Sequence, residues 1–279
     1  MTKFTTNEMF GYVIVGAGSA GCVLANRLSA DASIQVLLLE AGQSDRRSEI
    51  QIPAAFPKLL KTDRDWAYYT EPQPHLCDRQ LYWPRGKVVG GSSSINATIY
   101  VRGHRWDFDR WDKLGNSGWS YQEMLPYFKK AECQERGESE YHSADGVMSV
   151  SDLRYTNPLS HAFIEGAAEV GLPKISDFNV PEPEGVGFYQ VTHKRGRRHS
   201  SAAAYLKPCL PRPNLRICIG AHVTRLLWEK NRVVGVEYLR GGHLVQVKVD
   251  REVVLCGGAI NSPQLLMLSG VGDARHLEA

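Results

Sequence analysis

The hydrophobic pattern begins with a continuous apolar run from Tyr12 to Val15, which ends in a cluster of glycines. Apolar residues then recur at helical spacing as far as Leu28, and a second apolar run extends from Ile34 to Leu39. Runs of this kind are typical of parallel strands that are covered on both faces. The pattern predicts a strand, a tight turn, a helix and a second strand. Such a right-handed βαβ unit has its ligand side at the carboxyl ends of the strands.

The middle of the chain mixes helical patterns with aromatic and polar segments. Residues 51–74 are rich in aromatic side chains and broken by prolines, so we expect an ordered excursion there. Apolar positions recur at helical spacing in 119–132, where Ser120 is the predicted N-cap, and again in 158–170. The segment 135–145 is polar and is predicted to be exposed.

The last third of the chain carries short apolar runs separated by polar turns, a pattern that favours β-hairpins. The predicted strands are 215–219, 223–229, 232–239, 244–249 and 252–256. Glycines come after the last strand, and Ser262 and Pro263 then occupy the N-cap and N1 positions of a predicted helix over 264–269, which Gly270 ends.

Together these elements predict an α/β fold with a Rossmann-like dinucleotide-binding unit. The composition of the chain shifts near Gly146 and again near Gly196, which divides it into residues 1–145, 146–195 and 196–279.

The charge balance favours a small-molecule partner. Among the 279 residues, 33 lysines and arginines face 30 aspartates and glutamates, and a net charge of +3 is too weak to predict a nucleic-acid partner. No apolar run is long enough to predict an integral membrane segment. The first ten residues have neither a secretory nor a transit pattern, so the expected location is cytoplasmic. The oligomeric state is left open.

The cysteines do not predict a metal site. No CxxC pair or repeated spacing is present, so we interpret the thiols as reduced and predict neither a zinc site nor a disulfide scaffold. They are Cys22, Cys77, Cys133, Cys209, Cys218 and Cys256. The motifs of serine hydrolases, metalloproteases and P-loop enzymes are also missing.

The glycine cluster after the first strand has the GxGxxG spacing of a dinucleotide-binding turn. Gly16 allows the tight turn, Gly18 lets the backbone approach a pyrophosphate, and Gly21 lets the helix pack closely on the strand. Glu40 ends the next strand about 20 residues further on, where an acid binds the ribose hydroxyls and repels a 2′-phosphate. The alternative is an ordinary glycine turn with a solvated acid. The fingerprint by itself does not distinguish NAD from FAD.

Two further segments resemble signatures of the glucose-methanol-choline (GMC) oxidoreductases, a family of FAD-dependent enzymes that oxidise alcohols. The first is 86–96, GKVVGGSSSIN, and the second is 258–272, GAINSPQLLMLSGVG. The resemblance implies a Rossmann-like FAD-binding domain of GMC type and hydride transfer from an alcohol to the flavin. It also implies that residues 1–145 and 196–279 form a discontinuous FAD-binding domain that lacks its C-terminal part, and that residues 146–195 form a partial α+β substrate-binding domain. Some members attach FAD through a histidine, whereas the matching position here is Ile95. We therefore expect noncovalent FAD.

The resemblance also implies which residues meet the cofactor. They belong to the glycine turn, the end of the second strand, the Gly-Gly-Ser loop with the short segment after it, a strand expected at the adenine, and the second signature. These residues are Gly16, Ala17, Gly18, Ser19, Ala20, Gly21, Glu40, Ala41, Val88, Gly90, Gly91, Asn96, Ala97, Thr98, Ile99, Val223 and Ala259.

No catalytic residue is assigned. In GMC enzymes a histidine, paired with a second histidine or an asparagine, accepts the alcohol proton, and the resemblance places that pair beyond Ala279. We expect this chain alone to be inactive. Two alternatives stay open, namely a catalytically incomplete dinucleotide-binding fragment or pseudo-enzyme, and an NAD-dependent dehydrogenase. The alcohol and the electron acceptor, oxygen or another, are not predicted.

Overall fold

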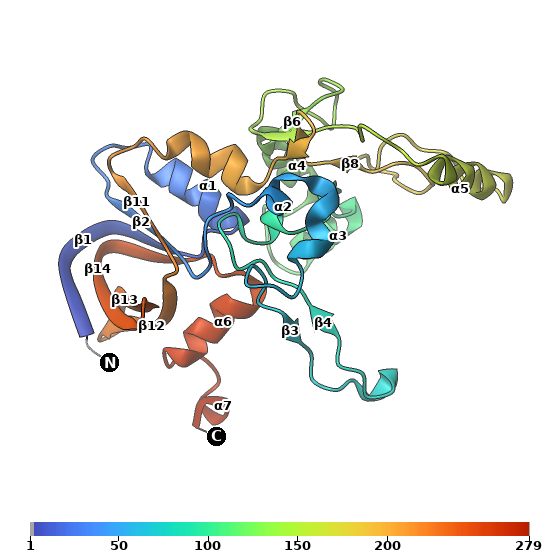
Figure 1. Cartoon of the computed structure of the whole chain (residues 1–279). Coiled ribbons are helices and arrows are strands. Elements are labelled where there is room, and N and C mark those ends of the chain that lie inside the picture. Colours follow the sequence, from blue (N-terminus) through green and yellow to red (C-terminus); the bar gives the residue numbers. More distant parts are fainter. Residues whose placement is uncertain (1–2, 279) are drawn as a thin grey trace. The chain divides into compact units, whose positions relative to one another are not determined.

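The computed structural model describes residues 3–278, which form two compact units (Figure 1). The first unit comprises Met1–Asn96 and Ser200–Ala279, and the second comprises Ala97–His199. The units therefore change after residues 96 and 199, whereas the shifts in composition lie near residues 146 and 196. Which part contacts cofactor and which contacts substrate stays a prediction.

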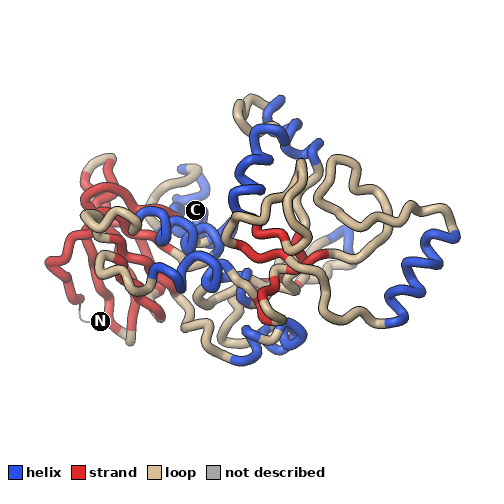
Figure 2. Tube along the Cα trace, turned by 90° about the horizontal axis from the view of Figure 1, so that it is seen from above, coloured by secondary structure: helices blue, strands red, loops and turns tan. Residues whose placement is uncertain are grey.

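A six-stranded sheet forms the centre of the first unit (Figure 2). Its strands are β1 (Lys3–Val15), β2 (Val36–Glu40), β11 (Leu215–Ile219), β12 (His222–Glu229), β13 (Arg232–Arg240) and β14 (His243–Leu255). Their order is β11-β2-β1-β14-β13-β12. The pairs β11–β2, β2–β1 and β1–β14 are parallel, and β14, β13 and β12 form an antiparallel meander. The predicted βαβ unit is thus present in a mixed sheet.

The core of this unit follows from the apolar runs. All five residues of β2 are buried, as expected for a strand that is covered on both faces. The helix α1 (Ser19–Leu28) packs against β1 and β2, and α6 (Gly258–Leu268) packs against β12. α1 starts shortly after the carboxyl end of β1, and α6 starts shortly after the carboxyl end of β14.

Two predicted elements differ from the structure in this unit. The strands predicted at 244–249 and 252–256 are one continuous strand, because β14 pairs with β13 along its first half and with β1 along most of its length. The helix predicted to start after Ser262 begins at Gly258 instead. Pro263 removes only the bond to the carbonyl of Ala259, so the first turn of α6 forms before it.

The remaining elements of the first unit are short. They are α2 (Ser48–Gln51), α7 (Ala274–Glu278), the strands β3 (Tyr68–Tyr69) and β4 (Tyr82–Trp83), the 3-10 helices Pro53–Leu59, Pro74–Leu76, Gly91–Ser94 and Lys207–Cys209, and the π-helical turn Ala202–Leu206. β3 and β4 pair as an antiparallel ribbon (Figure 1). The aromatic excursion predicted from residue 51 thus leads into an ordered ribbon.

The second unit combines three helices with three two-stranded sheets. The helices are α3 (Arg105–Lys113), α4 (Tyr121–Ala131) and α5 (Pro158–Glu169), and the strand pairs are β5 (Ile99–Tyr100) with β8 (Gln190–Val191), β6 (Glu132–Gln134) with β7 (Met148–Val150), and β9 (His193–Lys194) with β10 (Arg197–Arg198). The predicted cap is confirmed, because Ser120 and Glu123 form a reciprocal capping box on α4.

The prediction of an exposed segment at 135–145 is wrong for His142, which is 5% exposed. Its ring contacts the carboxylates of Glu132 and Asp177, and this pairing lets a charged side chain lie in the interior. No helix within residues 3–278 has the length and apolar character needed to cross a bilayer.

Candidate functional site

The glycine turn between β1 and α1 is shaped by close backbone contacts. Gly16 has φ +101°, and a Cβ atom there would lie 2.5 Å from the carbonyl oxygen of Cys256. A Cβ atom on Gly21 would lie 1.9 Å from the carbonyl oxygen of Gly16. Gly18 is the N-cap of α1, and no side chain caps the first turn. The positive end of the helix is therefore left for an anion, as the sequence predicts.

Glu40 lies at the carboxyl end of β2 with its carboxylate held by the backbone. The amide of Ala17 donates to Oε2 and the amide of Gly42 donates to Oε1, both at 2.8 Å. Burial raises the pKa of Glu40 to about 7, although both amides and the nearby Lys87 ammonium lower it. Each oxygen keeps a lone pair, so the carboxylate can still accept hydrogen bonds from hydroxyl groups in the cavity.

The loop that contains Gly90 and Gly91 packs directly on the glycine turn. The amide of Gly90 donates to the carbonyl of Ala17 at 2.7 Å. Both loop glycines have positive φ, and a Cβ atom on Gly91 would lie 2.7 Å from the Cα atom of Gly18. Any side chain at residue 91 would therefore collide with the turn. Two of the three sequence motifs meet here, backbone against backbone.

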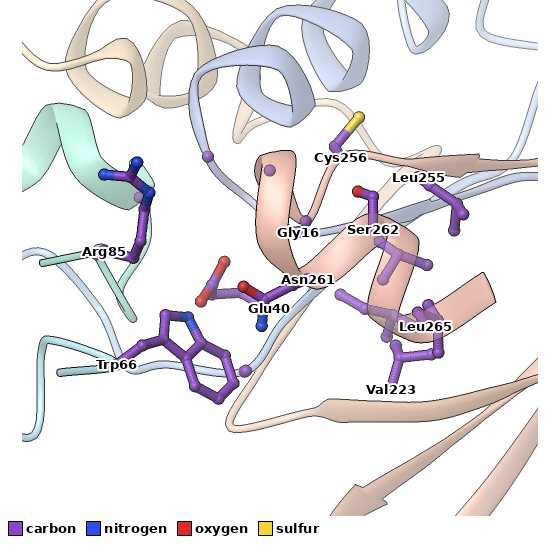
Figure 3. A pocket seen from close by; sticks show the side chains of 18 of the residues that line it. Gly16, Glu40, Trp66, Arg85, Val223, Leu255, Cys256, Asn261, Ser262 and Leu265 are labelled. Atoms are coloured by element: carbon purple, nitrogen blue, oxygen red, sulfur yellow. The ribbon is translucent and has the colours of Figure 1, made fainter. Parts of the chain in front are cut away.

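These segments enclose a cavity of about 490 Å³ (Figure 3). Its size falls in the range of small-molecule sites. Eight of the residues predicted to bind the cofactor line it, and they are Gly16, Gly18, Ser19, Ala20, Glu40, Ala41, Gly91 and Val223. The structure thus brings together residues from the turn, the ribose acid, the Gly-Gly loop and β12.

Other predicted residues of the same unit do not line the cavity. They are Ala17, Gly21, Val88, Gly90, Asn96 and Ala259. Val88 is fully buried and packs with Ile50, Leu59 and Ile95. Ala17 is also fully buried, and its amide is bonded to Glu40. Asn96 and Ala259 are exposed. The contact of these six residues with a cofactor stays a prediction.

The remaining predicted residues, Ala97, Thr98 and Ile99, belong to the second unit. Ile99 is half-exposed in β5. Thr98 is buried with φ +64°, a conformation that is uncommon for a β-branched residue. Its hydroxyl pairs with the imidazole Nε2 of His193 at 2.8 Å. Strained backbone of this kind concentrates at functional sites, and a cofactor contact of these residues stays a prediction.

Sequence reasoning missed a large part of the cavity wall. The additional lining residues come from the ribbon and its neighbours, the end of β14 and the helix α6. They are Val15, Leu39, Trp66, Arg85, Gly86, Ser92, Ala221, His222, Leu255, Cys256, Gly257, Gly258, Asn261, Ser262, Gln264, Leu265 and Leu268. Residues 86, 92, 258, 261, 262, 264, 265 and 268 lie within the two signature segments, although they were not singled out there. The aromatic segment and the predicted strand ends were the signals for most of the others.

The second unit holds a buried network of charges around Glu132. The guanidinium of Arg102 lies 2.8 Å from its carboxylate, and the imidazole Nδ1 of His142 lies 2.9 Å from it. The other ring nitrogen of His142 lies 2.7 Å from Asp177. Hydrogen bonds to Asp177 and Glu132 raise the pKa of His142 to about 9, so the ring is cationic at neutral pH.

A smaller cavity of about 240 Å³ borders this network and is lined by Arg102, His104, Phe178 and Asn179, among others. His104 is the N-cap of α3, where its ring accepts from the amide of Trp106 and Asp107 closes the capping box. That role explains His104 without catalysis. Within residues 3–278, no group of three His, Cys, Asp or Glu side chains is arranged to hold a metal ion.

Comparisons with known proteins agree on one family. The profile described as GMC oxidoreductase matches residues 10–278. An alcohol dehydrogenase [acceptor] of Pseudomonas putida is 50% identical over 274 residues, which are 97% of this chain and 50% of that protein. The mitochondrial choline dehydrogenase of Mus musculus is 49% identical over 278 residues, 97% of this chain and 47% of its own length. The chain spans about half the length of these curated relatives.

Solved structures give the same result for the fold. The crystal structure of pyridoxine 4-oxidase from Mesorbium loti superposes with a TM-score of 0.92 and 40% identity, over 97% of this chain and 53% of that one. The predicted Rossmann-like α/β fold is confirmed by this likeness and by the sheet.

Proposed function

Because the chain belongs to the GMC oxidoreductase family, we propose that it forms the FAD-holding part of an enzyme that oxidises an alcohol to an aldehyde or ketone. FAD is the cofactor of this family, as the three motifs predicted. The observation that carries the proposal is the single cavity in which the glycine turn, Glu40 and Gly91 meet. Bound FAD would supply the acceptor for a hydride from the alcohol carbon.

The residues of the cavity fit an ADP half. The amides at the start of α1 bind the pyrophosphate, since Gly18 leaves that end of the helix without a side-chain cap. The carboxylate of Glu40 accepts hydrogen bonds from the ribose hydroxyls. Gly91 leaves no room for a Cβ atom against the Cα atom of Gly18, so the loop packs backbone to backbone on the turn that would hold the pyrophosphate.

We further propose that FAD is bound noncovalently, because Ile95 is a buried hydrocarbon side chain that cannot bond to a flavin. The substrate is a small alcohol, in keeping with the names of the relatives from Pseudomonas putida and mouse. Residues 1–145 and 196–279 serve the cofactor, and 146–195 serve the substrate. The cytoplasmic location expected from the sequence is kept as part of the proposal.

A second candidate is a dinucleotide-binding module that does not turn over by itself. It is favoured by the share of its relatives that the chain spans, 50% and 47%, and by the lack of any assigned catalytic residue in that share. Both candidates require FAD in the same cavity, and they differ in whether an alcohol reduces it.

The test is to purify the chain, reconstitute it with FAD and record the flavin absorbance. We expect close to one FAD per chain, and acid precipitation should release all of it if the bond is noncovalent. Anaerobic addition of choline, ethanol or benzyl alcohol then separates the candidates, because bleaching indicates turnover. A chain that binds no FAD but retains a nicotinamide cofactor would overturn the proposal in favour of an NAD enzyme.

A further inference from the structure

The second unit contains a cavity of its own, with a volume of about 240 Å³. Among the described residues, none lines both this cavity and the cavity of the first unit. A cavity of about 150 Å³ is enough to hold one benzene ring, so this one has room for a single ring with a short substituent. Every residue that lines it belongs to the second unit, and the cofactor motifs do not explain it.

Aromatic side chains from two segments line this cavity. Phe178 and Tyr189 form a pair of rings with a centroid distance of 4.4 Å and an interplanar angle of 34°. Tyr121, the first residue of α4, also lines the cavity, and the centroid of its ring lies 6.1 Å from that of the buried Phe108. Aromatic faces and edges favour contact with another ring. The walls therefore suit a flat, apolar ligand.

One polar group of the lining has a defined direction of hydrogen bonding. The Nδ1 atom of His104 accepts a hydrogen bond from the amide of Trp106, so in the neutral ring the proton lies on Nε2. Because His104 lines the cavity, this Nε2–H group can donate to an acceptor on a ligand. The donor favours a ligand that carries a carbonyl or a similar oxygen.

The charges beside the cavity balance. The cations are Arg102, which lines the cavity, and His142, and they contact the carboxylates of Glu132 and Asp177. Two cations thus face two carboxylates, which leaves no net charge in this network to compensate an ionic ligand. A charge that enters a partly buried site without a partner is costly, so the site favours a neutral molecule.

The same charges hold two walls of the cavity in place. Phe178 and Asn179 directly follow Asp177 in the sequence. The carboxylate of Asp177 lies 2.7 Å from Nε2 of His142. The side-chain oxygen of Asn179 accepts from the amide of Arg102, also at 2.7 Å. Walls that are fixed before binding lose little freedom when a ligand enters.

We propose that this cavity binds a small neutral aromatic molecule that carries a hydrogen-bond acceptor, and that His142 is the positioning residue of its wall. The rings of Tyr121, Phe178 and Tyr189 contact the ring of the ligand, and His104 donates to its acceptor. The site lies outside the cofactor cavity, so this inference goes beyond the proposed function and does not depend on FAD.

The experiment titrates acetophenone into the full chain and follows the backbone amides of Gly103 and Val180 by NMR, since both residues line the cavity. Acetophenone is a neutral single ring with a carbonyl acceptor. We expect saturable shifts, with a dissociation constant on the order of 1 mM or below. A titration of these two amides that does not saturate would overturn the site.

Benzoate is the matched probe for charge, because it has the same number of heavy atoms as acetophenone but is an anion. It should bind at least about tenfold more weakly, since the network has no unpaired cation to compensate it. If benzoate binds as tightly as acetophenone, the assignment to neutral ligands is wrong.

Tyr189→Leu tests the aromatic wall, because it removes a ring and keeps an apolar side chain. We expect acetophenone to bind about 2- to 12-fold more weakly, the range for loss of one aromatic pair. The matched control is Tyr155→Leu, which changes a ring that is 75% exposed and outside the lining. It should leave the affinity unchanged, and an equal loss in both variants would contradict the aromatic wall.

His104→Asn tests the donor. Asparagine is a favoured N-cap residue, so α3 keeps its cap while the ring Nε2–H is removed. Acetophenone should bind about 2- to 12-fold more weakly, the worth of one hydrogen bond. Toluene, which has no acceptor, should bind the variant and the unmodified chain equally. An equal loss for toluene would show that His104 does not act as the donor.

His142 gives the site a pH dependence. Hydrogen bonds to Asp177 and Glu132 raise the pKa of its ring to about 9. Below this pH both ring nitrogens donate to carboxylates, whereas above it one nitrogen turns a lone pair toward a carboxylate. The charged groups around the ring are Glu132 of β6 and Asp177, with Arg102 paired to Glu132 and Arg136 acting on Asp177. The affinity for acetophenone should therefore fall as the pH rises through about 9.

His142→Gln removes this titration and should flatten the pH profile at a lower affinity. The control His161→Gln changes an exposed ring outside the lining and should keep the fall near pH 9. A purely structural residue would lower the affinity without removing the fall. The unmodified chain tests the same step without a substitution, and a flat profile there would overturn the positioning role of His142 while saturable binding preserves the site.

Discussion

The two units differ in the kind of contact that shapes their interiors. In the first unit the decisive contacts are between backbone atoms, because Gly21 lies against Gly16, and Gly91 lies against Gly18. In the second unit a buried carboxylate, Glu132, is neutralised by side chains from distant parts of the chain. A site made from close backbone contacts requires glycines, and their spacing can be recognised in the sequence. A network of side chains that meet only in the folded state has no recognisable sequence pattern.

The difference also appears in how each buried acid is satisfied. Glu40 accepts hydrogen bonds from two backbone amides. Among the described residues, its carboxylate forms no ion pair. Glu132 instead pairs with the cations Arg102 and His142. The carboxylate of Glu40 can therefore exchange a proton or accept hydrogen bonds from hydroxyl groups. The carboxylate of Glu132 is already occupied by the ion pairs of its unit.

The sharpest way to break this comparison is Gly21→Ala. The new Cβ atom would lie 1.9 Å from the carbonyl oxygen of Gly16, and this atom is backbone, so no flexible side chain can move aside. We expect loss of FAD and ADP binding and destabilisation of at least about 3 kcal/mol, measured by urea unfolding and calorimetry.

Gly166→Ala is the matched control. It lies in α5, and apart from its chain neighbours and the adjacent backbone of the helix, no described atom lies within 4 Å of the Cβ that alanine would add. Alanine should leave FAD binding unchanged and stabilise the helix by about 0.5–1 kcal/mol. If Gly21→Ala binds FAD as the unmodified chain does, the backbone contacts of the turn do not determine the site.

The second prediction concerns the charged network. Glu132→Ala leaves the buried guanidinium of Arg102 without its carboxylate, and breaking a buried pair in this way costs about 3–5 kcal/mol. In a hydrogen-exchange experiment, only the backbone amides of the second unit should lose protection. Glu135→Ala is the control, because its pair with Arg154 is largely exposed and is worth less than about 1 kcal/mol. Equal effects of the two substitutions would contradict the distinction between the units.

The same contrast explains what the sequence predicts well. The βαβ unit, the glycine turn and Glu40 are local, so residues close in sequence are close in space. The N-cap Ser120 could also be predicted, since its partner Glu123 lies one helical turn away. The cavity wall was predicted only in part, because Trp66 and His222 meet through the fold of the whole unit.

Other differences have similar causes. His142 was predicted to be exposed because its neighbours are polar, but Asp177 and Glu132 reach it from other segments. The start of α6 was placed at Ser262 because a serine before a proline is a strong local cap signal. The helix instead begins at Gly258, shortly after the end of β14. For His142, the local signal failed because partners from other segments pair with its ring.

The smallest predicted effect is a pH dependence of ADP binding that comes from Glu40. Its pKa is raised to about 7, above the ordinary value of 4.5, so the free chain carries it protonated below pH 7. The contribution of this carboxyl to the free energy of unfolding of the free chain is fully present below pH 4.5. It is lost as the pH rises to about 7, because the unfolded chain gives up the proton at a lower pH than the folded chain. Ribose hydroxyls donate to the ionised form. The affinity for ADP should therefore fall by up to about tenfold per pH unit below pH 7 and level off above it.

Calorimetry between pH 6.5 and 8.5, in two buffers of different ionisation enthalpy, measures both the affinity and the protons released. Two other groups near the cavity are unaffected in this window, because burial lowers the pKa of His222 and raises the pKa of the Cys22 thiol to about 12. Glu40→Gln should abolish the slope and bind more weakly at pH 8. A slope that survives in Glu40→Gln would mean that another group titrates. The contrast between Glu40, which exchanges a proton, and Glu132, which is held in ion pairs, would then be wrong.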